Sequence, residues 1–157
     1  MEIGEEFFRH HRDKLFGYLM RMTGDYHLAS DLLQESFTRC LEKYRYQALS
    51  PSLLYTIARH ALIDHKRKQD RTVPLDGDRV DGRPDVEQTH LIRAEYRRVL
   101  LAMKKLEPDE QDILALVISG DLSYREIASF TGLSEANVKI KVHRARLNLK
   151  RILSKGD

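Results

Sequence analysis

A pattern of helix caps around a single glycine, near the C-terminus, constrains the fold of this chain more than any other feature. Ser123 and Glu126 form a capping box, in which each side chain accepts a hydrogen bond from the other residue's backbone N–H. Gly132 follows, where a tight turn needs a residue that tolerates positive φ. Ala128 and Val138 stand four residues before and six after it. This spacing predicts a helix-turn-helix, with a small residue at the helix crossing and an apolar anchor in the second helix.

The second helix of this motif has a strongly basic side. Apolar residues at 138, 142, 145, 149 and 152 recur at helical steps and form its inward stripe. The outward or sideways positions are Asn137, Lys139, Ile140, Lys141, His143, Arg144 and Arg146. Such a helix can lie in the major groove of DNA, where Lys and Arg meet phosphates and guanine edges. The alternative is a basic helix that is only solvated. The caps, the turn and the charge all fit a DNA-binding motif and disfavour this alternative.

The first seventy residues also show helical spacing, punctuated by Gly24 and by the pair Ser50–Pro51. Cys40 falls on the apolar stripe of the second helix, so we expect a buried core thiol rather than a nucleophile. As the lone cysteine, it also excludes an internal disulfide and any multi-cysteine metal site.

Two polar surfaces are expected on these N-terminal helices. On the second helix a polar strip recurs at i, i+3, i+4 and i+7, and it is either a solvated face or a protein-docking surface. Its members are Asp31, Gln34, Glu35 and Thr38. On the third helix, the residues predicted to pack inward are Leu54, Ile57, Ala58, Ala61 and His65. Those predicted to remain on the surface are Tyr55, Arg59, His60, Lys66 and Arg67.

The segment 71–89 divides the chain. Two prolines, two glycines and five aspartates fall between residues 70 and 85, with few apolar residues, so this stretch cannot build a core and is predicted to be a flexible acidic linker. Strand signals are scarce throughout. We therefore predict an all-α protein of two small helical domains, 1–70 and 90–157, joined by this linker.

Charge is distributed unevenly along the 157 residues, although the formal net charge is only +3. Residues 51–72 carry five Lys or Arg against two Asp or Glu, and residues 123–157 carry eight against three. Residues 73–90 have the opposite balance, with two against five. Two basic blocks separated by an acidic stretch suggest two contacts with a polyanion.

These motifs together resemble the extracytoplasmic-function (ECF) group of bacterial sigma-70 factors. The stretches LEPDEQDIL from Leu106, LSYREIA from Leu122, GLSEANVK from Gly132 and HRAR from His143 are similar to the fourth conserved domain of that family. DLLQESF from Asp31 resembles the polymerase-binding helix of its second domain, and YTIARHALIDHKR from Tyr55 resembles its promoter-melting helix. The resemblance covers nearly the whole chain except the linker.

The resemblance implies a role for each surface. The C-terminal domain would bind the minus-35 promoter element as duplex DNA through the basic face listed above. Many relatives have Ser-Arg where this chain has Ile140–Lys141, and an aliphatic side chain can touch a thymine methyl but cannot donate a hydrogen bond, so a shifted base preference is implied. The N-terminal domain would hold the opened minus-10 strand by stacking and phosphate contacts. The residues implied there are Tyr46, Tyr55, Arg59, His60, Lys66 and Arg67.

The same resemblance places Asp31, Gln34, Glu35 and Thr38 on a docking surface for the clamp coiled coil of the largest subunit of core RNA polymerase. It further implies an anti-sigma protein, often membrane-bound, that holds the factor inactive. The implied location is cytoplasmic, in agreement with the lack of a leader or a membrane-spanning run in the sequence.

Two other classes remain to be weighed. An enzyme is disfavoured because no glycine-rich phosphate loop, nucleophile elbow or catalytic carboxylate pair stands out, and no small-molecule substrate or cofactor is expected. The nearest metal pairs, His60 with Asp64 and His10 with His11, lack a third ligand. A stand-alone transcriptional regulator is the second alternative, with the first domain as a sensor or dimerisation unit.

Overall fold

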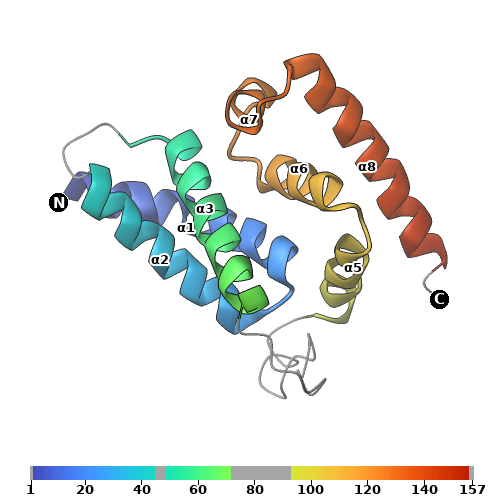
Figure 1. Ribbon diagram of the computed structural model, residues 1–157, viewed down its shortest axis with the longest axis horizontal. Coiled ribbons are helices and arrows are strands. Elements are labelled where there is room, and N and C mark those ends of the chain that lie inside the picture. The colour runs from blue at the N-terminus through green and yellow to red at the C-terminus, as the bar shows by residue number, and fades with distance from the viewer. Residues whose placement is uncertain (1, 45–48, 72–92, 156–157) are drawn as a thin grey trace.

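The computed structural model describes residues 2–44, 49–71 and 93–155, and within these ranges the chain forms α-helices and no strands (Figure 1). The all-α prediction is confirmed. The N-terminal body consists of α1 (Glu2–Thr23), α2 (Tyr26–Tyr44) and α3 (Pro51–Arg71). The C-terminal body consists of α5 (Ala94–Lys104), α6 (Pro108–Ser119), α7 (Tyr124–Thr131) and α8 (Glu135–Lys155). The predicted linker, 71–89, lies outside the described residues apart from Arg71, which ends α3.

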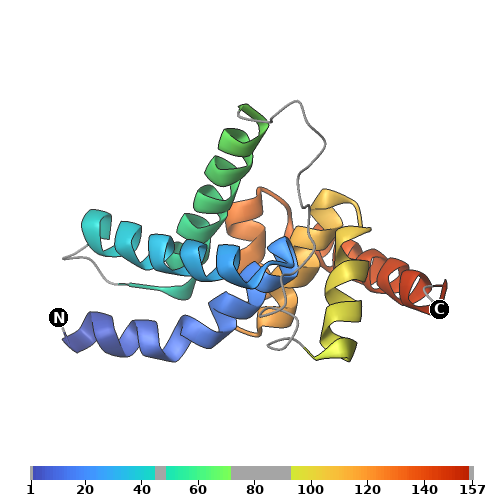
Figure 2. The ribbon, with the colours of Figure 1, turned by 90° about the horizontal axis from the view of Figure 1, so that it is seen from below.

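Capping residues define the starts of α2 and α3. An Asp25 carboxylate oxygen accepts a hydrogen bond from the Leu28 backbone N–H at 3.1 Å and caps α2. The Ser50 hydroxyl accepts one from the Leu53 N–H at 3.2 Å, and Pro51 occupies the first position of α3. Helices α1 and α2 pack side by side, and α3 leans away from the layer that they form (Figure 2).

The core of the N-terminal body is made by the predicted apolar stripes. Leu54 and Ala58 of α3 are completely buried, and Ile57 and Ala61 are nearly so. Cys40 is also fully buried, and burial raises the pKa of its thiol, which agrees with a packing role.

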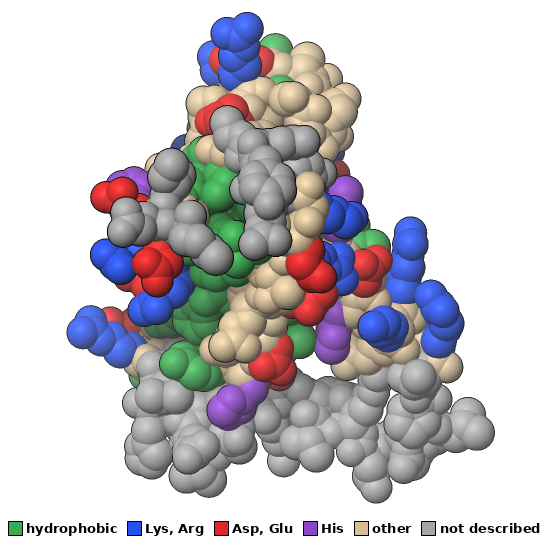
Figure 3. All heavy atoms as spheres, turned by 90° about the vertical axis from the view of Figure 1, so that its left-hand side faces the viewer, with side chains coloured by type: hydrophobic (Ala, Val, Ile, Leu, Met, Phe, Trp, Pro, Cys, Tyr) green, Lys and Arg blue, Asp and Glu red, His purple; other side chains and the backbone are tan. Residues whose placement is uncertain are grey.

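At the end of this body where α1 begins, the surface is partly apolar. Hydrophobic side chains gather there in a central band flanked by charged ones (Figure 3). The rings of Phe8 in α1 and Phe37 in α2 stack with their centroids 4.3 Å apart and are half-buried. An aromatic pair of this kind ties the start of α1 to the end of α2.

The C-terminal body is assembled around α6, which contacts α5, α7 and α8. This helix is apolar on most of its faces, and Ile113, Leu114, Ala115 and Leu116 are all buried. A helix that is apolar all round needs cover on every side. Helix α1 of the N-terminal body covers the side of α6 that the other C-terminal helices leave open (Figure 1).

The two bodies therefore pack against each other, a point that the sequence left open. Helix α1 contacts α6 and α5, and α3 contacts α7. The buried Gln111 side-chain amide donates to the Arg21 carbonyl oxygen at 2.9 Å, and the Arg21 guanidinium donates to the Ala115 carbonyl oxygen at 3.2 Å. One continuous set of buried residues runs through both bodies.

Candidate nucleic-acid interface

The helix-turn-helix forms as predicted, from α7, the turn at Gly132 and α8. The Ser123 hydroxyl accepts a hydrogen bond from the Glu126 N–H at 3.0 Å, and the Glu126 carboxylate accepts one from the Ser123 N–H at 2.9 Å. Gly132 has a φ of 78°, a left-handed conformation that a side chain would strain. The Ser134 hydroxyl caps α8 by accepting from the Asn137 N–H at 3.1 Å.

The inward stripe of α8 is tightly packed, which orients the opposite face outward. Val138 and Ala145 are 0% exposed, and Val142 is 1% exposed. Six of the seven predicted outward residues are exposed: Asn137, Lys139, Ile140, His143, Arg144 and Arg146. The structure thus brings together four cationic or imidazole side chains, one amide and one aliphatic side chain on a single helix face, beside the half-buried Lys141.

Lys141 differs from its neighbours because it is engaged within the protein. Its ammonium forms an ion pair with the Asp109 carboxylate at the start of α6. This hydrogen bond lowers the pKa of Asp109. About two turns further along α8, the Asn148 amide donates to both Glu110 carboxylate oxygens at 3.0 Å. These two contacts hold α8 across the beginning of α6.

The second predicted surface, on α3, is only partly open. His60, Lys66 and Arg67 are exposed, as predicted. Tyr46 lies outside the described residues. The same helix also presents Lys68, which makes the exposed C-terminal half of α3 strongly basic.

Tyr55 is not on the surface, and that prediction is wrong. Its side chain is 0% exposed, packed edge-to-face against Tyr18 with ring centroids 5.6 Å apart. The helical spacing of α3 predicted that Tyr55 lies away from the core of the N-terminal body. The end of α6 covers this face of α3, however, and Tyr55 lies near Ser119 and Asp121. Burial raises the pKa of Tyr55.

Arg59 also departs from the surface position that was predicted. Its guanidinium donates to one carboxylate oxygen of Asp112, from Nη2 at 2.6 Å and from Nε at 3.0 Å. It also lies 5.3 Å from the centroid of the Phe130 ring in α7. The physical reason is again the contact between domains, because both partners belong to the C-terminal body.

The polar strip of α2 is open to solvent. Asp31, Gln34, Glu35 and Thr38 are all exposed, so the predicted face exists as a surface. Within it, the Glu35 carboxylate accepts from Arg39 Nε at 2.8 Å, and Arg39 also reaches Asp64 of α3 at 3.0 Å. These two ion pairs hold the Glu35 side chain in place, and Asp31 is exposed one turn earlier on the same face.

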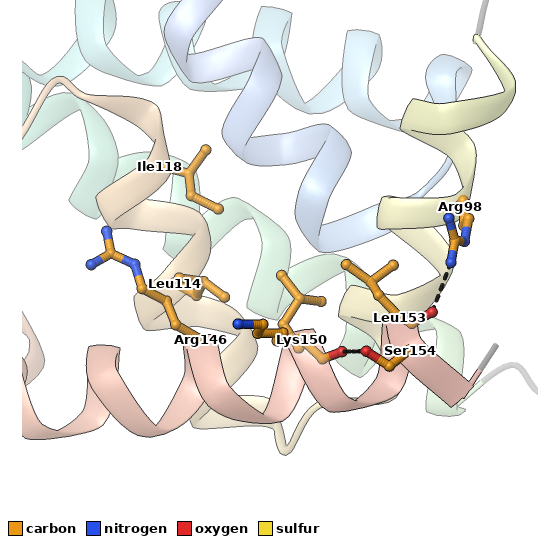
Figure 4. A pocket seen from close by; sticks show the side chains of 8 residues that line it. Arg98, Leu114, Ile118, Arg146, Lys150, Leu153 and Ser154 are labelled. Atoms are coloured by element: carbon orange, nitrogen blue, oxygen red, sulfur yellow. Dashed lines mark hydrogen bonds between the residues drawn. The ribbon is translucent and has the colours of Figure 1, made fainter.

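Sequence reasoning missed an apolar groove of about 450 Å³ between α5, α6 and α8 (Figure 4). Its apolar lining is Leu114, Ile118, Leu149 and Leu153. Its polar lining is Arg98, Arg146, Lys150 and Ser154. The Arg98 guanidinium donates to the Leu153 carbonyl oxygen at 2.7 Å and closes one end. The sequence feature that could have indicated this groove is the continuous aliphatic run of α6, in which Ile118 remains 45% exposed.

Two further findings concern cofactors and membranes. Among the described residues, no group of three His, Cys, Asp or Glu side chains is placed so as to hold a metal ion. None of the helices in the described ranges combines the length and the apolar character that a membrane span requires.

Comparison with known proteins follows the same two-part division. Residues 7–72 match the family described as "Sigma-70 region 2", and residues 96–149 match "Sigma-70, region 4". The chain is 31% identical to the ECF RNA polymerase sigma factor SigM of Bacillus subtilis, with 97% of this chain and 96% of that protein covered. It is 30% identical to the RNA polymerase sigma factor YlaC of the same organism, with 97% and 92% covered.

Two solved structures share the fold. The sigma factor RpoE in its complex with the anti-sigma factor NepR from Bartonella quintana matches with a TM-score of 0.74 at 18% identity, over the full length of both chains. CnrH in complex with the cytosolic domain of CnrY matches with a TM-score of 0.70 at 18% identity, over 98% of this chain and 89% of that one. From the two matched regions and the full-length relatives, the chain belongs to the sigma-70 family of RNA polymerase sigma factors, in its extracytoplasmic-function group.

Proposed function

We propose that this chain is a promoter-specificity subunit, which binds core RNA polymerase, reads two promoter elements and helps to open the DNA between them. It performs no covalent chemistry itself. The observation that carries the proposal is the exposed basic face of α8 on a correctly capped helix-turn-helix, in a chain with both sigma regions. The proposed domains are 1–70 and 90–157, with 71–89 as the linker.

For the C-terminal domain, the proposed ligand is the minus-35 element as duplex DNA. Lys139, His143, Arg144 and Arg146 are exposed on one face and can reach phosphates and guanine edges, and Asn137 can meet adenine. Ile140, 48% exposed, offers an apolar surface to a thymine methyl group. Lys141 takes part only when its ion pair with Asp109 yields to phosphate.

For the N-terminal domain, the proposed ligand is the opened minus-10 strand, held by Tyr46, Tyr55, Arg59, His60, Lys66 and Arg67. Unpairing costs about 1.4 kcal/mol per base step, and stacking a base on an aromatic side chain returns about 1–3 kcal/mol. His60, Lys66 and Arg67 are already exposed. Tyr55 and Arg59 can take part only after the C-terminal body leaves α3, because α6 and α7 cover them.

Two protein partners belong to the same proposal. Asp31, Gln34, Glu35 and Thr38 form an exposed acidic and polar strip that suits a basic coiled coil, and we assign it to the polymerase clamp. An anti-sigma protein is the second partner, since RpoE from Bartonella quintana, a sigma factor of the same fold, is seen in complex with the anti-sigma factor NepR. A membrane-bound anti-sigma protein would hold an otherwise cytoplasmic factor at the membrane.

Run-off transcription with purified core polymerase tests the proposal. The chain is added to core polymerase on fragmented genomic DNA, and the transcripts are sequenced. We expect discrete start sites that share upstream sequences at minus-10 and minus-35 spacing. Binding to DNA without polymerase, combined with no stimulated transcription, would instead identify a stand-alone regulator.

A further inference from the structure

The centre of the outward face of α8 is apolar, although the face as a whole is basic. Successive residues of a helix are turned by about 100° around its axis. Ala136 and Ile140 stand two residues before and two after the buried Val138, so both point almost directly away from the core. Both are exposed, Ile140 by 48%. They lie about 6 Å apart along the axis and form a short apolar line down the middle of this face.

Cationic side chains lie on both sides of the apolar line. Measured around the helix axis from the middle of that line, Lys139 is turned by about 80° to one side and Arg144 by about 60° to the other. Both are exposed, unlike Lys141, which is paired with Asp109. Helix α8 lies along one edge of the molecule, with α6 and α7 on its inner side (Figure 1). Its outward face is therefore open to a duplex.

A helix that enters the major groove presents its centre to the base edges and its sides to the two phosphate backbones. The N-terminal turns of a recognition helix make the base contacts. In the first two turns of α8, Glu135–Val142, the central positions are Ala136 and Ile140. Neither side chain can donate or accept a hydrogen bond. Base recognition by these two positions must therefore depend on apolar contact.

We propose that Ala136 and Ile140 are specificity-determining residues that select thymine by its C5 methyl group. The inference rests on the proposed function of α8, and it names the base that the centre of this helix reads. The thymine methyl is the apolar group that base pairs present in the major groove, and an aliphatic side chain against it removes apolar surface from water. A separation of about 6 Å corresponds to about two base steps of 3.4 Å. The minus-35 element thus contains two thymines at this spacing.

The same two side chains reject G·C base pairs. Guanine presents two acceptors to the major groove, and cytosine presents an amino donor. An aliphatic side chain against these groups takes them out of water without a partner, which is costly. Lys139 and Arg144, at the sides, contact phosphates and carry no sequence information. Asn137, exposed beside the apolar line, can bind the adenine of an A·T pair.

The test replaces thymidine by deoxyuridine, which lacks the C5 methyl group but keeps the hydrogen-bonding atoms of the base. Binding to the full chain first selects a duplex from a random-sequence pool, and the selected duplex is then made with thymidine or with deoxyuridine. Fluorescence anisotropy measures the dissociation constant of each. Burial of one methyl group changes affinity about fourfold, so two contacts predict that the wild-type chain binds the deoxyuridine duplex about fifteenfold more weakly.

Variants of α8 assign this ratio of dissociation constants to particular side chains. Ile140→Ala should lower the ratio to about fourfold, since only the contact of Ala136 remains. Leu147→Ala is the matched control, because Leu147 is 51% exposed on the same face but lies about 10 Å further along the helix. Its ratio should stay at about fifteenfold. Ile140→Val keeps a branched aliphatic side chain and should keep most of the ratio. Each ratio is taken within one variant, so a general change in affinity or stability cancels.

Three outcomes overturn the proposal: a selected duplex without thymine, a wild-type ratio close to one, and equal ratios for Ile140→Ala and Leu147→Ala. These outcomes are distinct from failure of the proposed function. If the wild-type chain does not support run-off transcription but its ratio depends on Ile140, the sigma assignment fails and thymine recognition stands. If transcription is supported and the ratio does not depend on Ile140, only thymine recognition fails.

Discussion

At the residue scale, two buried tyrosines on the contact between the bodies differ in what their hydroxyls meet. Tyr18 and Tyr55 are both 0% exposed, and their rings touch. The Tyr18 hydroxyl donates to Asp112 at 2.7 Å, whereas the Tyr55 hydroxyl lies near Ser119 and Asp121 and makes no well-aligned hydrogen bond within the described residues. Burial raises the pKa of both phenols, so each stays neutral and protonated at physiological pH.

Removal of each hydroxyl should change the stability in opposite directions. Tyr18→Phe should lower the free energy of unfolding by about 1 kcal/mol, because Asp112 loses a donor. Tyr55→Phe should raise it by about 1 kcal/mol, because a buried hydroxyl without a well-aligned hydrogen bond disappears. Urea denaturation followed by circular dichroism measures both, and each variant is the other's matched control. An equal loss in the two variants would mean that the Tyr55 hydroxyl is paired in solution.

A second prediction at this scale concerns the cations of α8. The double variant Lys139→Ala with Arg144→Ala should weaken duplex binding, and the slope of log affinity against log salt should shrink by roughly 2. Arg12→Ala with Lys43→Ala removes the same charge from exposed positions of α1 and α2 and should leave the slope unchanged. An unaltered slope in the α8 variant contradicts the phosphate contacts assigned to these two residues.

At the scale of elements, the caps explain why the helix-turn-helix could be predicted residue by residue. The two hydrogen bonds of the capping box, at 2.9 and 3.0 Å, join residues only three apart in sequence. The left-handed φ of Gly132 and the Ser134 cap are equally local. The exposed face of α8 could be predicted from its buried stripe, because residues that are not on the inward side of a helix must point outward or sideways.

Ser123→Ala should lower the free energy of unfolding by about 1 kcal/mol, since it leaves the Glu126 N–H without its acceptor. Ser129→Ala is the control in the same helix, because Ser129 is exposed inside α7 and alanine is the better helix former. Thermal unfolding monitored at 222 nm compares the two. A loss of stability in Ser129→Ala as large as that in Ser123→Ala would show that the effect is not capping.

At the scale of the whole molecule, the surfaces that we propose for different partners differ in how open they are. The α2 strip and the α8 face are open, whereas the α3 face is partly covered by α6 and α7. Under the proposed function, binding of polymerase to the α2 strip would not require the two bodies to separate, whereas binding of DNA by Tyr55 and Arg59 of α3 would. The proposed order is therefore that the free chain binds polymerase first and an opened DNA strand afterwards.

Charge reversal on the α2 strip tests the polymerase-docking assignment. Asp31→Lys with Glu35→Lys should reduce recovery of the chain with core polymerase at least tenfold in a pull-down, by like-charge repulsion across the interface. Glu5→Lys with Glu6→Lys makes the same charge change at exposed positions of α1 and should leave recovery unchanged. Circular dichroism verifies the fold, because Glu35→Lys also breaks the pair with Arg39. Unimpaired recovery of the α2 variant would move the docking site elsewhere.

The sequence by itself determined the helices, their caps, the buried Cys40, the open α2 strip and the basic face of α8. These features depend on hydrogen bonds and packing between residues up to about one helical turn apart, which a linear pattern records. Only the tertiary structure decided that Tyr55 is buried, that Arg59 is paired and that a groove runs along α8. Asp112 lies 94 residues from Tyr18 and 53 from Arg59 in the sequence. Their contact therefore depends on how the N-terminal and C-terminal bodies pack against each other. No local pattern encodes that contact, because each partner alone is an ordinary polar residue on the outside of its own helix.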